Sequence, residues 1–78
     1  MINNAFNPVH DFTMRRVAMT FGGWREKGLT SKAAKAAAAL EIRNDSVALS
    51  AVRDALPYMK ARGSVAYGIS LRVLRGAN

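Results

Sequence analysis

The chain has no cysteine among its 78 residues. Disulfide bridges, thiolate metal sites and cysteine nucleophiles are therefore excluded together, and packing alone must hold the fold. Large side chains are scarce as well, because the sequence contains only three Phe, two Tyr and one Trp. A chain this short buries a small fraction of its surface. We therefore expect a single domain over residues 1–78 with a thin core, which a homodimer would thicken.

Acidic residues are few. Five Asp and Glu stand against twelve Lys and Arg, which gives a formal net charge of +7 and a sequence pI near 10.9. The basic excess is spread along the whole chain, and near the C-terminus it is interleaved with apolar residues such as Val65 and Ile69. That interleaving argues against a disordered basic tail. A polyanion is therefore the first partner to expect.

Long apolar runs are missing too. No stretch of about 18 apolar residues occurs, so no membrane-spanning helix and no membrane partner are expected. The first residues, Met1 to Asn4, lack the basic and apolar regions of a secretory signal. A cytoplasmic protein is the expectation.

Groups for catalysis or metal binding are sparse. His10 is the only histidine and stands beside Asp11, without a cysteine or a positioned serine as nucleophile. The acids are scattered, so neither paired carboxylates nor a metal cluster is indicated. We therefore expect no enzyme activity, no metal and no cofactor, and a helix cap or polar surface group as the role of His10.

Residues 1–7 are rich in asparagine and are predicted to form a flexible N-terminal arm ahead of a helical core over residues 8–62. Asn7-Pro8 is typical of a helix start, because asparagine is a good N-cap and proline is tolerated at the first helical position. Apolar residues then recur at spacings of three and four. This pattern predicts a first helix over residues 8–26.

A second and a third helix follow. Thr30 or Ser31 fits the N-cap of an alanine-rich helix over residues 31–41. After a polar break, apolar residues at helical spacing predict a helix over residues 46–56 or beyond. Pro57 is expected to end that helix or to open a last turn, because proline lacks the backbone donor and clashes with the preceding turn.

Residues 64–74 follow a different period. The odd-numbered positions from Val65 to Val73 are all apolar, which is typical of a strand rich in β-branched and aromatic residues. A helix is the competing interpretation, because Val65, Ile69 and Val73 are also four apart. Gly68 would weaken a helix interior. We therefore expect a β element here, either one strand or a hairpin.

The order of helix, short polar turn and helix over residues 28–56 resembles the helix-turn-helix family. The spacing of four residues is close to that of the core positions of this family: Ala37, Leu40, Ile42 and Val47. Glu41 departs from the family pattern, which often has glycine there. With the β element included, the chain resembles a winged-helix domain. The expected class is mostly α, a three-helix core with a small C-terminal β-strand or hairpin (α+β).

The resemblance implies a DNA-binding protein, a transcriptional regulator of phage or plasmid type, whose helix after Asp45 enters the major groove of double-stranded DNA. The residues that it would place against the groove are Arg43, Asn44, Ser46, Ser50 and Arg53. The residues that it would place against phosphates are Lys32, Lys35, Arg72 and Arg75. Each of them has a plainer interpretation as a solvated polar group on a helix surface.

Two other functions fit the same composition. One is a small effector that docks on an acidic surface of a host protein and inhibits it. The other is a structural component of a nucleoprotein particle, whose basic residues neutralise the packaged genome. Charge alone does not separate these functions from DNA regulation, because all three use a positive face.

Overall fold

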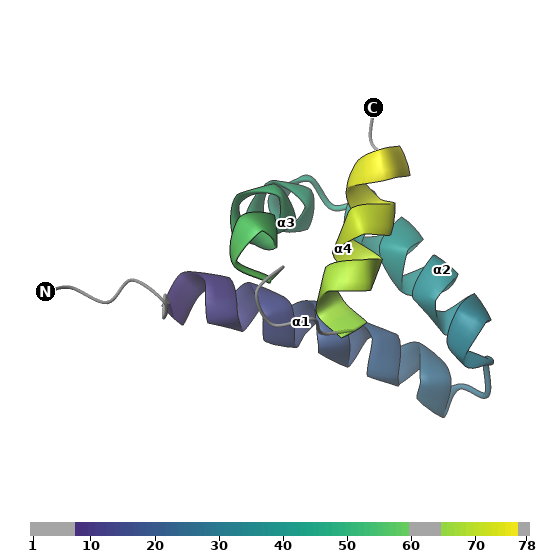
Figure 1. Ribbon diagram of the computed structural model, residues 1–78. Helices are drawn as coiled ribbons and strands as arrows, with labels where there is room; N and C mark the ends of the chain where they lie inside the picture. Colours follow the sequence, from purple (N-terminus) through teal and green to yellow (C-terminus); the bar gives the residue numbers. More distant parts are fainter. Residues whose placement is uncertain (1–7, 60–64, 77–78) are drawn as a thin grey trace, which may run out of the picture.

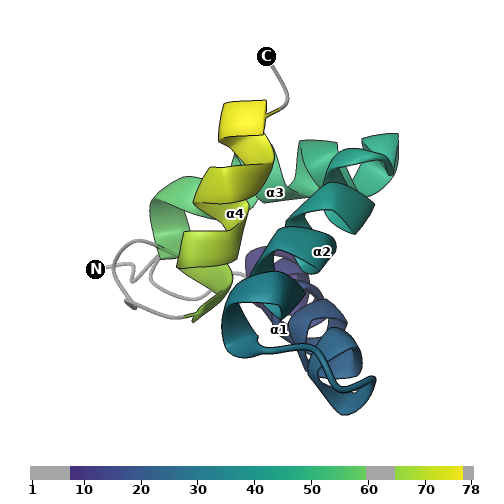
Figure 2. The ribbon, with the colours of Figure 1, turned by 90° about the vertical axis from the view of Figure 1, so that its right-hand side faces the viewer.

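The computed structural model describes residues 8–59 and 65–76, so the predicted arm over residues 1–7 lies outside the described part. The described residues form four helices: α1 (Pro8–Glu26), α2 (Ser31–Arg43), α3 (Ser46–Met59) and α4 (Val65–Gly76). Helix α1 packs against the other three, which lie above it in Figure 1. Figure 2 shows the same arrangement from the side, with α4 and α2 toward the viewer.

The first two helices begin where local signals predict. α1 covers the predicted residues 8–26 without a break, and Gly28 follows with a φ of 97°, a left-handed conformation that glycine tolerates. The hydroxyl of Thr30 accepts a 3.2 Å hydrogen bond from the backbone N–H of Ala33 and so caps α2. α2 runs two residues beyond the predicted end, to Arg43.

Of the two expectations for Pro57, the second is met, because α3 does not end at residue 56 but continues to Met59 with Pro57 inside its last turn. A proline so close to the end removes one hydrogen bond from the helix. Met59 is fully buried, and its sulfur accepts a 3.2 Å hydrogen bond from the hydroxyl of Ser70 on α4. Burial of Met59 therefore holds the last turn of α3 against the core.

The predicted β element over residues 64–74 is wrong, since residues 65–74 belong to α4 and no strand occurs in residues 8–59 and 65–76; residue 64 lies outside the described part. The buried residues of α4 follow the helical spacing of three and four: Ala66, Ile69, Ser70 and Val73. Gly68 lies on the exposed side, where it costs about 1 kcal/mol of helix propensity. Packing of the buried face outweighs that cost. The described residues are therefore all α, and the winged-helix α+β class does not apply.

The core between the helices consists of small and medium-sized side chains. Its largest fully buried members are Met59, Ile69, Val17, Val52 and Val73. No aromatic side chain of the described residues is fully buried, and Phe12 is 67% exposed. The core is thus as thin as the composition predicts, and large apolar groups remain on the surface.

Candidate nucleic-acid interface

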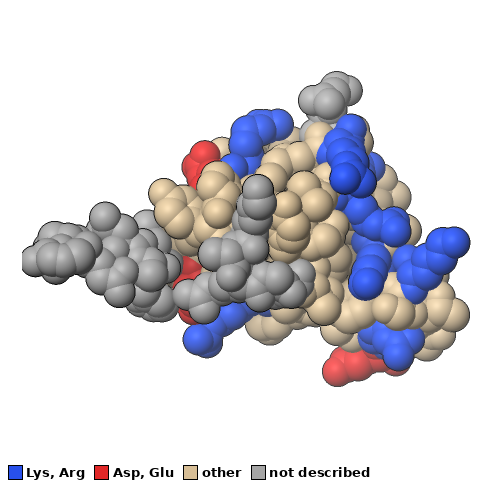
Figure 3. Space-filling view, in the orientation of Figure 1, with Lys and Arg blue, Asp and Glu red and all other residues tan. Residues whose placement is uncertain are grey.

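Charged side chains divide the molecule into two halves. Helices α2 and α4 carry five basic residues and one acidic residue, a net charge of +4. Helices α1 and α3, with Lys27 after α1 and Asp45 before α3, carry five basic and four acidic residues, a net charge of +1. Figure 3 shows basic side chains gathered over α2 and the C-terminal half of α4. We call these residues the basic face: Lys32, Lys35, Arg43, Arg72 and Arg75.

The one acidic residue of α2 is turned away from this face. Glu41 accepts a 2.9 Å hydrogen bond from the indole N–H of Trp24 on α1. It lines a different hollow, together with Met19 and Lys27 from the α1 side. The positive charge that α2 and α4 share is therefore not neutralised by Glu41.

Three arginines border one hollow on the basic face. The hollow lies between the C-terminal parts of α2 and α4, has a volume of about 380 Å³, and is lined by Ala36, Ala39, Leu40, Arg43, Arg72 and Arg75. The alanines leave space between the helices because their side chains are short. Guanidinium groups present planar, forked donors that match the oxygens of a phosphate. The hollow therefore has the chemistry of an anion site.

Arg43 joins α2 to the end of α4. Its Nε and Nη2 atoms donate hydrogen bonds to the backbone carbonyls of Val73 and Arg72, at 3.2 and 2.8 Å. A cation at a helix C-terminus also interacts favourably with the helix dipole. A Cβ atom added at Gly76 would fall against this guanidinium group. Arg43 therefore caps α4 as well as bordering the hollow, a role that no local sequence signal indicates.

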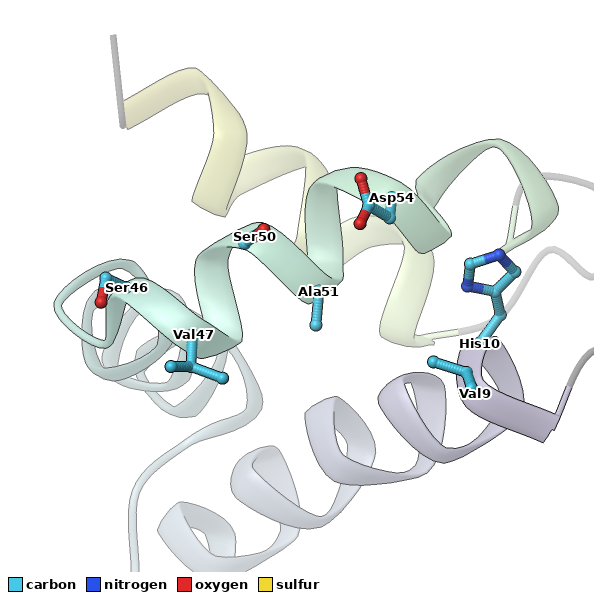
Figure 4. A pocket seen from close by; sticks show the side chains of 7 residues that line it. All are labelled: Val9, His10, Ser46, Val47, Ser50, Ala51 and Asp54. Carbon is cyan, nitrogen blue, oxygen red and sulfur yellow. The ribbon is translucent and has the colours of Figure 1, made fainter.

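Four of the five residues predicted to contact the DNA groove lie outside the arginine hollow. Asn44 is exposed and ends α2, with its backbone N–H donating to the carbonyl of Leu40 at 3.1 Å. Ser46, Ser50 and Arg53 are exposed on α3. The two serines line a hollow of about 440 Å³ between α3 and the start of α1 (Figure 4). The groove contact proposed for these residues stays a prediction, and only Arg43 of that set borders the arginine hollow.

His10, Ser50 and Asp54 line this second hollow together, yet no hydrogen bond joins them in the described part of the chain. The ring of His10 stacks on Tyr58, with 4.5 Å between centroids and 19° between planes. Its Nδ1 atom is buried and has no hydrogen-bond partner among the described residues. A serine–histidine–aspartate triad needs those hydrogen bonds to orient the imidazole. His10 instead fastens the start of α1 to the end of α3 by ring stacking.

Asp45 fixes the start of α3. Its Oδ1 atom accepts hydrogen bonds from the backbone N–H groups of Ala48 and Val47, at 3.1 and 3.0 Å, and Oδ2 pairs with Arg16 at 3.2 Å. The hydrogen bond from Ala48, followed by that from Val47 and the charge of Arg16, lowers the pKa of Asp45 despite partial desolvation. The carboxylate therefore stays ionised near neutral pH and ties α3 to α1.

Among the described residues, no three side chains of metal-ligating type come together, and no helix of that part is long and apolar enough to cross a membrane. No protein-family model, curated protein or solved structure matches the chain. Geometry and charge alone thus indicate the basic face as the candidate site.

Proposed function

We propose that the chain binds nucleic acid through the basic face, with double-stranded DNA as the expected ligand. The observation that carries this proposal is the arginine hollow, where Arg43, Arg72 and Arg75 meet and no acidic residue is among the lining side chains. Each cation that neutralises a phosphate releases bound counterions from the duplex. Such contacts supply affinity without reading sequence.

The placement of the cations on two packed helices supports the proposal. Arg72 and Arg75 are three residues apart on α4, and Lys32 and Lys35 have the same spacing on α2, so each pair lies about one turn apart. Arg43 is held by two backbone carbonyls. Cations on an ordered helix backbone lose less conformational entropy on binding than those of a flexible tail.

The helix-turn-helix resemblance implies that α3 would contact the edges of the DNA bases. The exposed strip of Ser46, Ser50 and Arg53 carries one cation, and Asp54 stands beside Arg53. We therefore expect most of the affinity to come from the basic face and sequence preference to be weak. A regulatory role would require Arg53 to add preference for particular bases.

Salt-dependent binding to a labelled duplex tests the proposal. The double variant Arg72→Ala/Arg75→Ala should lower the slope of log affinity against log salt by about 1.8 and weaken binding by about 50-fold near 0.1 M salt. The matched control Arg15→Ala/Arg16→Ala removes the same charge from α1 and should weaken binding by less than about fivefold. Wild-type protein that does not bind, or equal losses in the two variants, would contradict the proposal.

A further inference from the structure

A second exposed surface, on the half formed by α1 and α3, is apolar. Val9 and Phe12 on α1 are each 67% exposed, and Val47 on α3 is 72% exposed. They border a hollow of about 180 Å³ between the two helices, with Val17 and Val52 among the other lining residues. Figure 4 shows Val9 and Val47 on the facing sides of α1 and α3. We call this surface the apolar groove.

The charges around the apolar groove are paired. Arg16, which lines it, forms an ion pair with Asp45 at 3.2 Å, and Arg15 pairs with Asp11 at 2.9 Å. A polyanion therefore gains little here. A second copy of this chain, which carries the same net charge of +7, meets less repulsion when the two weakly charged α1–α3 halves face each other than when the basic faces do.

We infer that the apolar groove binds a second copy of this chain in a contact with two-fold symmetry. Such a contact brings the same surface of both copies together, and this surface carries a projecting ring, Phe12, beside a hollow. A specific interface needs about 1,000 Å² of buried area in total, or about 500 Å² per copy. That is about a tenth of the 5186 Å² exposed by one chain.

The thin core also favours a second copy of the chain as the partner. Because no aromatic side chain of the described residues is fully buried, covering Phe12 would add the largest single apolar contact to the molecule. The dimer would leave α2 and α4 of both copies uncovered. Two basic faces would then be joined in one particle, which raises avidity for any polyanion that reaches both.

Sedimentation equilibrium of the full chain without nucleic acid tests the inference, from micromolar to submillimolar concentration. The mass should rise from 8.5 kDa toward about twice that value. Phe12→Glu buries one carboxylate from each copy in the contact and should raise the dimer Kd by about 50-fold or more.

Met19→Glu is the matched control, because Met19 lies on the same helix, is 75% exposed and lines the separate hollow beside Trp24. Its dimer Kd should stay within about twofold of wild type. Circular dichroism checks that both variants fold. Val47→Glu gives a second test from α3, and it should raise the Kd as Phe12→Glu does.

A wild-type mass of 8.5 kDa at every concentration would overturn the inference. Equal effects of Phe12→Glu and Met19→Glu would overturn it too, since the contact would then lie outside the apolar groove. A monomer that binds DNA refutes the dimer alone, and a dimer that does not bind DNA refutes the proposed function alone.

Discussion

The two halves of the molecule, α2 with α4 and α1 with α3, differ in how their charged side chains are paired. Both ion pairs of the described residues, Arg15–Asp11 and Arg16–Asp45, belong to the α1–α3 half. The α2–α4 half has five cations and one acid, Glu41, which faces α1. Charge that is spread evenly along the sequence is thus sorted in space. Folding creates one surface suited to a polyanion and another suited to an apolar contact.

Arg43 both stabilises α4 and contributes charge to the basic face. We therefore expect its substitution to give the largest change in the free energy of unfolding. Arg43→Lys keeps the charge but lacks the forked donors that reach the carbonyls of Arg72 and Val73. We expect the free energy of unfolding to fall by about 1 to 2 kcal/mol in urea titrations. The slope of log DNA affinity against log salt should stay the same, because the variant has the same number of cations.

The control for this change is Arg53→Lys, which alters an exposed arginine on α3. It should change stability by less than about 0.5 kcal/mol. If both variants were equally stable, the hydrogen bonds from Arg43 to α4 would contribute nothing measurable to stability. Arg43 would then contribute only its charge to the basic face.

A smaller effect separates the stability of α4 from binding. Gly68→Ala should raise the free energy of unfolding by about 1 kcal/mol, because alanine is the better helix former and the added Cβ meets no atom within 4 Å. Thermal or urea unfolding measures the gain, and DNA affinity should stay unchanged because no charge changes.

Gly76→Ala is the matched control on the same helix, where the added Cβ falls against the guanidinium group of Arg43. It should give no gain. A loss of stability in Gly68→Ala would contradict the helical packing of α4 and would favour an extended conformation for this segment.

Local signals predicted the starts of the first three helices, because a cap such as Thr30 bonds only to its own next turn. The last helix was missed because its period depends on packing. Ala66 and Ser70 are buried against the other helices, yet small or polar residues carry little weight in an apolar pattern. The alternation of the odd-numbered residues therefore looked stronger than the helical spacing.

The candidate site was predictable in part. The four residues expected at phosphates all lie on α2 and α4, although a β element and not a helix was expected around Arg72. Arg43 was expected in the groove with Ser50, whereas the fold brings it to Arg72 and Arg75. That contact joins residues 30 positions apart. It arises from the packing of α2 against α4, which no motif in the sequence specifies.

The central claim is that one half of the molecule, and not the other, meets nucleic acid. Titration of an isotopically labelled chain with a DNA duplex, followed by backbone amide shifts in NMR spectra, tests it most directly. We predict the largest shifts at the C-terminal turns of α2 and α4, around Arg43, Arg72 and Arg75, with small shifts along α1. Shifts concentrated on α3 around Ser50 and Arg53, with α4 unchanged, would contradict the claim.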